Sequence, residues 1–95
     1  MLELPIDGVL DLHAFRPRDI RSVVDAYVTA AWEAGLAEIR IIHGRGKGVQ
    51  RGIVQAALDQ HTLVVEFWDA DESHLGATIA RLAGPAAAPG PKTIP

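Results

Sequence analysis

The sequence predicts an α/β fold: a two-layer sandwich of order β-α-β-α-β-β, in which two helices cover a four-stranded mixed sheet. Short β-branched segments alternate with amphipathic helical segments, and this alternation favours parallel strands joined by right-handed crossovers. The last two strand-like segments have no helix between them, so the final strand can return antiparallel. The 95 residues, 48% hydrophobic and 22% charged, suffice for one globular domain with one core.

The first half of the chain predicts an extended segment, a strand and a helix. Residues 1–7 alternate apolar and polar side chains and are expected to form an extended lead-in. A short strand is predicted over 9–12, directly after an Asp-Gly turn signal. Pro17 suits the first turn of a helix over 18–34, whose apolar residues recur at helical spacing, and Gly35 ends it.

The next two segments predict a buried strand and a second helix. Isoleucines dominate residues 38–43, which favours a strand with little exposure. The helix is expected to start near Gly48 and to close at His61. Its core-facing side chains are predicted to be Ile53, Val54, Ala57 and Leu58. Its water-facing side chains are predicted to be Arg51, Gln55 and Asp59.

Two more strands and a tail complete the prediction. The third strand is predicted over 62–68, and the fourth over 78–82, entered through Gly76. Alternation divides the third strand into one face with Leu63, Val65 and Phe67 and another with Val64, Glu66 and Trp68. Repeated prolines remove backbone donors after the domain, so residues 84–95 are expected to be a disordered tail rich in Pro, Ala and Gly. The domain itself is placed at 8–83.

Composition excludes several classes of protein. The absence of cysteine excludes a disulfide framework, a thiolate zinc site and a cysteine nucleophile. No stretch has the apolar length of a membrane span, so we expect no membrane partner and a cytoplasmic location. The net charge of −3 argues against a protein that coats nucleic acid by bulk electrostatics.

Charge is distributed unevenly along the chain. Residues 40–51 carry Arg and Lys side chains and no acid, whereas residues 59–72 carry Asp and Glu without Lys or Arg. The acidic block is expected to be a solvated surface. The basic block overlaps a glycine-rich segment and points to an anionic ligand.

Two polar clusters fall at predicted strand ends, where open parallel sheets place their ligand sites. Asp11 and His13 follow the first strand, and His43 follows the second, thirty residues after His13. If these strands are neighbours, the two rings come close, and two imidazoles can supply an acid and a base near neutral pH. Asp11 could orient or charge the imidazole of His13. The alternative is that Asp11 caps a turn and His13 is an ordinary loop residue.

The second cluster continues into a loop with alternating glycines, Gly44-Arg45-Gly46-Lys47-Gly48. Glycines allow positive φ and close backbone approach, and the loop opens a helix whose free N–H groups attract an anion. The two basic side chains add mobile positive charge, so a phosphate would fit. The loop matches neither the P-loop nor the dinucleotide fingerprint, and a purely structural turn is the competing interpretation.

Together, Leu10-Asp11-Leu12-His13 and the later His43-Gly44-Arg45-Gly46-Lys47-Gly48 resemble the Smr domain, the small MutS-related family, over roughly residues 8–82. The resemblance implies a sandwich similar to the C-terminal domain of translation initiation factor three, nucleic-acid binding and, in many members, endonuclease or nicking activity. It implies that the catalytic residues are Asp11, His13 and His43. It implies that the residues contacting nucleic acid or its phosphates are Gly44, Arg45, Gly46, Lys47, Gly48, Gly76 and Thr78.

The leading hypothesis is therefore a phosphodiester-cleaving domain, in which His13 and His43 share base and acid roles and Asp11 orients an imidazole. With RNA, the 2′-hydroxyl can be the nucleophile and no cofactor is required. With DNA, water must attack, and a divalent cation (Mg or Mn) bound through Asp11 and through Asp69 or Asp71 becomes more plausible.

Two alternatives stay open. The family often has glycine where this chain has Ala14, and its later glycine-rich turn is reduced here to residues 73–76. These departures and the acidic total charge favour a non-catalytic nucleic-acid or ribosome-binding module. A third reading is a protein-binding adaptor that uses the sheet face near Val64 and Trp68.

Overall fold

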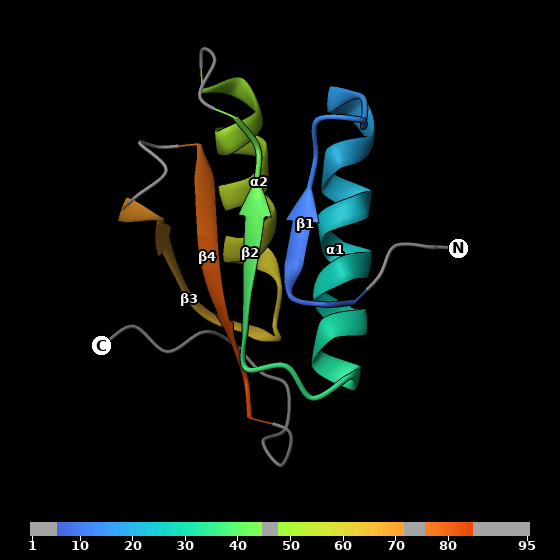
Figure 1. Ribbon diagram of the computed structural model, residues 1–95, viewed down its shortest axis with the longest axis vertical. Helices are drawn as coiled ribbons and strands as arrows, with labels where there is room; N and C mark the ends of the chain where they lie inside the picture. The colour runs from blue at the N-terminus through green and yellow to red at the C-terminus, as the bar shows by residue number, and fades with distance from the viewer. Residues whose placement is uncertain (1–5, 45–47, 72–75, 85–95) are drawn as a thin grey trace.

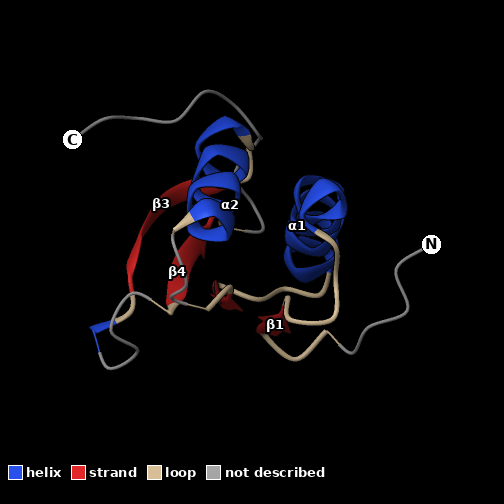
Figure 2. Cartoon of the chain, turned by 90° about the horizontal axis from the view of Figure 1, so that it is seen from above, coloured by secondary structure: helices blue, strands red, loops and turns tan. Residues whose placement is uncertain are grey.

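The computed structural model describes residues 6–44, 48–71 and 76–84. The elements follow in the order β1 (Val9–Asp11), α1 (Pro17–Glu33), β2 (Glu38–Ile42), α2 (Val49–Gln60), β3 (Val64–Asp69) and β4 (Ala77–Leu82). Both helices lie on one face of the four-stranded sheet (Figures 1 and 2). The predicted two-layer α/β sandwich and its element order are confirmed.

The sheet order is β1-β2-β4-β3. β1 and β2 pair in parallel across the α1 crossover, whereas β4 pairs antiparallel with both β2 and β3. The helix between β2 and β3 favours these two strands as parallel neighbours, but β4 lies between them and separates them. The burial of β4 agrees with this central place, since five of its six residues are buried.

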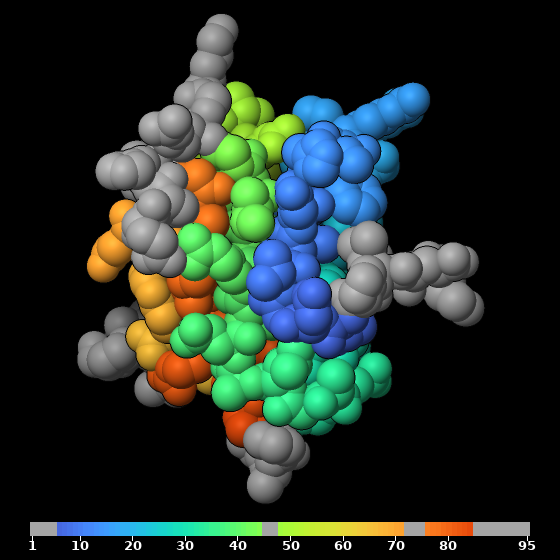
Figure 3. All heavy atoms as spheres, in the orientation of Figure 1, coloured from blue at the N-terminus to red at the C-terminus, as the bar shows by residue number. Residues whose placement is uncertain are grey.

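The core fills the space between the sheet and the helices. Alternation points one side chain in two toward the helices, as with Leu10 of β1 and Ile41 of β2, both at most 1% exposed. The opposite face of the sheet carries a smaller apolar cluster of Ala70, Ala77 and Ile79, with Ile42 packed against it. Figure 3 views the molecule from this open face, where the surfaces of β1, β2 and β4 lie side by side.

β3 departs from the predicted alternation. Its register with β4 shifts between Val64 and Glu66, as a β-bulge does. Val64 and Phe67 consequently both pack on the main core, although they were assigned to opposite faces. Trp68 is 40% exposed and Val64 only 1%. The predicted adaptor surface is therefore wrong for Val64, because the extra residue of the bulge turns this side chain toward the helices.

The helix ends agree with their sequence signals. Gly35 takes φ 83° after α1, and its N–H donates to the carbonyl of Trp32 at 3.0 Å. His61 is the C-cap of α2, as predicted. Over the described ranges, neither helix is long and apolar enough to cross a membrane. The predicted tail, apart from Gly84, and most of the predicted lead-in lie outside the described residues.

Candidate functional site

Asp11 and His13 form an exposed pair where β1 ends. One carboxylate oxygen of Asp11, Oδ1, accepts the backbone N–H of His13 at 3.0 Å and contacts its ring Nδ1 at 2.9 Å. The side chain of His13 is 83% exposed and that of Asp11 is 49% exposed. Asp11 therefore both caps the turn and holds the imidazole, as each interpretation of this motif required of Asp11. Whether His13 is catalytic or an ordinary loop residue stays a prediction.

The protonation of this pair follows from its partners. The backbone N–H of His13, and then its ring, stabilise the carboxylate and lower the pKa of Asp11 below its usual value. An ionised carboxylate only accepts, so ring Nδ1 carries the hydrogen. In the neutral ring the lone pair then belongs to Nε2, which no side chain of the described residues covers by a hydrogen bond. This arrangement presents a base to solvent.

His43 is placed very differently, directly after β2. It is 5% exposed, and both of its ring nitrogens have partners. Nδ1 lies 2.9 Å from the carbonyl oxygen of Gly44, and Nε2 lies 2.9 Å from the hydroxyl of Thr78, which is fully buried on β4. The ring is thus held from both sides within the protein.

The two predicted catalytic rings therefore do not open into one cleft. β1 and β2 are neighbours, with Asp11 opposite Ile42, as the sequence argument required. Strand alternation nevertheless sends Asp11 to the open face and His43 to the face covered by α2. Shared acid and base roles for His13 and His43 do not fit this geometry, because the ring of His43 offers no nitrogen to a substrate.

Behind His43 lies a polar network that the sequence analysis missed. The amide of Gln55 on α2 donates to Thr78 Oγ1 at 3.1 Å and to Asp69 Oδ1 at 3.0 Å. Arg51 holds both carboxylate oxygens of Asp69, through Nε at 2.8 Å and through Nη2 at 2.7 Å. Arg51 and Gln55 were expected to face water, and Asp69 belonged to the block expected to be solvated. One signal was available: Arg51 and Gln55 are spaced by one helical turn and share a stripe.

The electrostatics of this network are dominated by its ion pair. The hydrogen bonds from Arg51 lower the pKa of Asp69, with a smaller contribution from the hydrogen bond of Gln55, and the same contact raises the pKa of Arg51. Asp69 is therefore ionised and already fully engaged at neutral pH. That engagement counts against it as the metal ligand considered from the sequence.

The glycine-rich loop is described at its two ends. Gly44 and Gly48 have φ of 79° and 82°, the left-handed region that glycine adopts without strain. The backbone N–H groups of His43 and Gly44 both donate to the carbonyl of Gly76, at 3.0 and 2.9 Å, which ties the loop to the start of β4. The predicted phosphate contacts Arg45, Gly46 and Lys47 lie outside the described residues.

Thr78 was expected to contact nucleic acid and does not face solvent. Its exposed fraction is 0%, and its hydroxyl is shared between His43 and Gln55. Gly76 is half-buried and uses its carbonyl to hold the loop. Both residues support the backbone of the loop from beneath.

No group of three His, Asp or Glu side chains comes together to hold a metal ion among the residues that the structure describes. Asp71 is exposed at the end of the segment after β3. Asp11 retains exposure, and it could supply one carboxylate to a cation that also contacts a phosphate.

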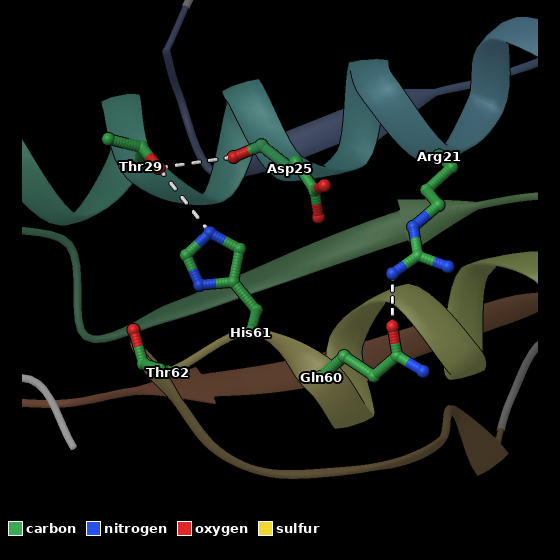
Figure 4. A pocket seen from close by; sticks show the side chains of 6 residues that line it. All are labelled: Arg21, Asp25, Thr29, Gln60, His61 and Thr62. Atoms are coloured by element: carbon green, nitrogen blue, oxygen red, sulfur yellow. Dashed lines mark hydrogen bonds between the residues drawn. The ribbon is translucent and has the colours of Figure 1, made fainter. Parts of the chain in front are cut away.

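A separate polar hollow of about 290 Å³ lies between α1 and the end of α2 (Figure 4). Arg21 donates to the side-chain oxygen of Gln60 across it. The ring of His61 bonds to Thr29, and its other nitrogen accepts the backbone N–H of Leu63 at 3.1 Å. None of the predicted site residues lines this hollow, and four of its polar side chains are paired: Arg21 with Gln60, and Thr29 with His61.

Comparisons with known proteins show what the chain resembles. The sequence pattern of the Smr domain matches residues 10–83. Endonuclease MutS2 of Caldicellulosiruptor saccharolyticus is 35% identical over 82 residues, covering 84% of this chain and 10% of that protein. Endonuclease MutS2 of Geobacillus kaustophilus is 40% identical over 75 residues, covering 77% and 10% respectively. The chain thus spans about a tenth of the length of these relatives.

Two solved structures share the fold. The crystal structure of the Smr domain of Thermus thermophilus MutS2 is similar with a TM-score of 0.76 and 28% identity, over 80% of this chain and 98% of that one. YdaL, a stand-alone small MutS-related protein from Escherichia coli, gives a TM-score of 0.74 and 26% identity, over 82% and 66%. The similarity therefore extends to a protein in which the domain stands alone.

Proposed function

This chain belongs to the Smr domain family, and from that premise we propose that it binds nucleic acid and cleaves phosphodiester bonds with Asp11 and His13 as its proton-transfer pair. Its MutS2 relatives are named endonucleases, which supports the proposal. The observation that carries it is the exposed imidazole of His13, whose Nδ1 is held by Asp11. A base must reach its proton, and among the predicted catalytic imidazoles this one can.

The proposed chemistry is simplest with RNA. Nε2 of His13 takes the proton of a 2′-hydroxyl, and the 2′ oxygen attacks the adjacent phosphorus. The bond from phosphorus to the 5′ oxygen breaks, and the leaving oxygen takes a proton from water, which leaves a cyclic phosphate and a 5′-hydroxyl. Asp11 stabilises the imidazolium that forms meanwhile, as the carboxylate of a catalytic triad does. With DNA the nucleophile is water, and Mg or Mn held in part by Asp11 would activate it.

Phosphate binding is assigned to the glycine-rich loop and the start of α2. No side chain caps the first turn of this helix, and its N-cap is Gly48 with left-handed φ. The first amides of the helix and the side chains of Arg45 and Lys47 would together hold a phosphate. His43 contributes by fixing the first residue of the loop.

The test is cleavage of end-labelled single strands of RNA and DNA with one sequence, with and without EDTA. We expect His13→Ala and Asp11→Asn to lose cleavage while His61→Ala, a histidine change in the separate hollow, retains it. Loss of cleavage in EDTA would indicate that the reaction requires a divalent cation, and retained cleavage would indicate the metal-free route. Cutting by His13→Ala at the wild-type rate would overturn the proposal.

A second candidate function is a non-catalytic nucleic-acid or ribosome-binding module, and the burial of His43 favours it, since of the two predicted catalytic imidazoles that of His13 alone is then exposed. Under it, the oligonucleotides bind without being cut, His13→Ala binds normally, and Arg45→Ala or Lys47→Ala weakens binding and its salt dependence. The cytoplasmic location and the ribosome contact expected from the sequence remain predictions.

A further inference from the structure

A continuous chain of hydrogen bonds runs from the surface of α2 to the glycine-rich loop. It begins at the Arg51–Asp69 ion pair, passes through Gln55 to Thr78, and continues through His43. It ends at the carbonyl oxygen of Gly44. Each of its contacts is between 2.7 and 3.1 Å.

The chain has a direction, which its charged end sets. The Asp69 carboxylate only accepts, so it fixes the amide of Gln55 with NH₂ rather than oxygen toward it. The second hydrogen of that NH₂ then goes to Thr78 Oγ1. A hydroxyl can accept two hydrogen bonds, but among the described residues Nε2 of His43 is the one neighbour bonded to Thr78 Oγ1 that can accept the hydroxyl hydrogen. The hydroxyl therefore directs its hydrogen to Nε2, which carries none of its own.

The other end of the chain requires the same state of the ring. A carbonyl oxygen only accepts, so Nδ1 of His43 must carry the hydrogen that faces Gly44. Both neighbours thus select one neutral tautomer, with the hydrogen on Nδ1. With the hydrogen on Nε2 instead, the lone pair of Nδ1 would oppose the oxygen of Gly44, and this backbone would have to move.

We propose that Gln55, oriented by Asp69, is a positioning residue that holds His43 in the Nδ1–H tautomer and through it fixes Gly44 at the start of the glycine-rich loop. Asp69 thereby fixes the orientation of the whole chain of hydrogen bonds from Arg51 to Gly44, which we call the relay. The effect on ligand binding rests on the proposed function, because it requires this loop to hold the phosphate. The tautomer itself does not depend on that function.

The first measurement is ¹⁵N NMR of the histidine rings at neutral pH, which reports which nitrogen carries the hydrogen. In the wild-type protein we expect His43 in the Nδ1–H form alone. Gln55→Met keeps side-chain length and helix propensity but removes both donated hydrogen bonds, so the hydroxyl of Thr78 can turn and accept from Nε2. The carbonyl of Gly44 then selects the tautomer alone, and we expect an Nε2–H population to appear beside the Nδ1–H form. Gln60→Met, the same change at the other end of the same helix and outside the relay, should leave the ring as in wild type.

A second variant keeps the test decisive if Gln55→Met does not fold. Asp69→Asn preserves size and removes the charge that orients Gln55, so the amide is free to flip and the single tautomer should again be lost. An Nε2–H ring in the wild-type protein, or an unchanged ring in a folded variant of Gln55 or Asp69, overturns the proposal.

The second measurement is the affinity for a labelled single-stranded RNA. We expect Gln55→Met to weaken binding by roughly three- to tenfold, the usual effect of one hydrogen bond, and Gln60→Met, at the far end of α2, to leave it unchanged. If wild-type protein binds neither RNA nor DNA, the proposed function fails while the NMR result still decides the relay. If wild type binds and Gln55→Met binds equally well despite a mixed ring, the link from tautomer to loop is wrong.

Discussion

The two predicted catalytic histidines, His13 and His43, differ in how far along the chain their partners lie. His13 is held by Asp11, two residues away, and both side chains are largely in solvent. His43 is held by Thr78, thirty-five residues away, within a network that spans α2, β3 and β4. A local contact leaves a ring free to meet a ligand, whereas contacts from several elements make a ring part of the fold.

This difference also predicts how much each ring contributes to the free energy of folding. Exposed ion pairs contribute about 0–1 kcal/mol to folding, because water and salt compete for both charges. A buried polar group whose partner is removed costs about 1–3 kcal/mol, because its desolvation is no longer compensated. His13 should therefore be dispensable for stability, and His43 should not.

The largest expected effect is on activity at His13. His13→Ala removes the proposed base, so the cleavage rate should fall by roughly 10²- to 10⁴-fold, the usual contribution of general acid–base catalysis. The free energy of unfolding should change by less than about 0.5 kcal/mol, as is usual for exposed sites. Single-turnover cleavage and urea unfolding measure the two quantities. Loss of both together would mean that the exposed ring also supports the fold.

The next effect is on stability at His43. His43→Ala leaves a cavity and strands the buried hydroxyl of Thr78, so the free energy of unfolding should fall by about 2–4 kcal/mol. Urea titration followed by circular dichroism gives this value, with His61→Ala as the control for a partly exposed histidine. A wild-type midpoint for His43→Ala would contradict the assigned role of the network.

Lowering the pH should reduce the stabilising contributions of Asp11 and Asp69 to different extents. The pKa values of Asp11 and Asp69 are both lowered in the folded protein, so the unfolded chain binds protons first as the pH falls. Each carboxylate thus contributes stability that is present above its unfolded pKa of about 3.9 and is lost as the pH falls through its lower folded value. Asp69 is the less exposed of the two carboxylates and is held at both oxygens. Asp69→Asn should therefore reduce the loss of the free energy of unfolding at low pH more than Asp11→Asn does. Urea midpoints measured from neutral pH down to about pH 3 make the comparison, and a larger effect at Asp11 would contradict it.

Local sequence patterns were sufficient to predict the helices and strands and the exposed pair of Asp11 and His13. Helical spacing, Pro17 and Gly35 placed α1, and the spacing of Asp11 and His13 placed both on one side of β1. These features depend on residues within a few positions of one another, and that is the range over which sequence periodicity carries information.

What the sequence missed depends on contacts between distant segments. β4 inserts between β2 and β3, and only that insertion brings Thr78 beneath His43 and opposite Asp69. Polar residues on a helix are normally solvated, so the inward bonds of Gln55 could not be inferred from α2 alone. Similarly, the bulge in β3 places the side chain of Val64 on the other face of the sheet, and no glycine or proline in this strand indicates the bulge.

The smallest expected effect is on stability at Glu66. It tests whether exposure or sequence distance causes the contrast between His13 and His43. Glu66 and Arg81 lie fifteen residues apart on neighbouring strands and form an ion pair at 2.5 Å, yet their side chains are 50% and 48% exposed. If exposure governs, Glu66→Gln should cost less than about 1 kcal/mol and the cost should shrink further in high salt, although the pair joins distant segments. Asp69→Asn, which alters an ion pair of similar span but lower exposure, should cost more under the same conditions. Equal costs for the two variants in urea unfolding at low and high salt would mean that sequence distance, and not burial, sets the energetic value of these contacts. The contrast between His13 and His43 would then need another explanation.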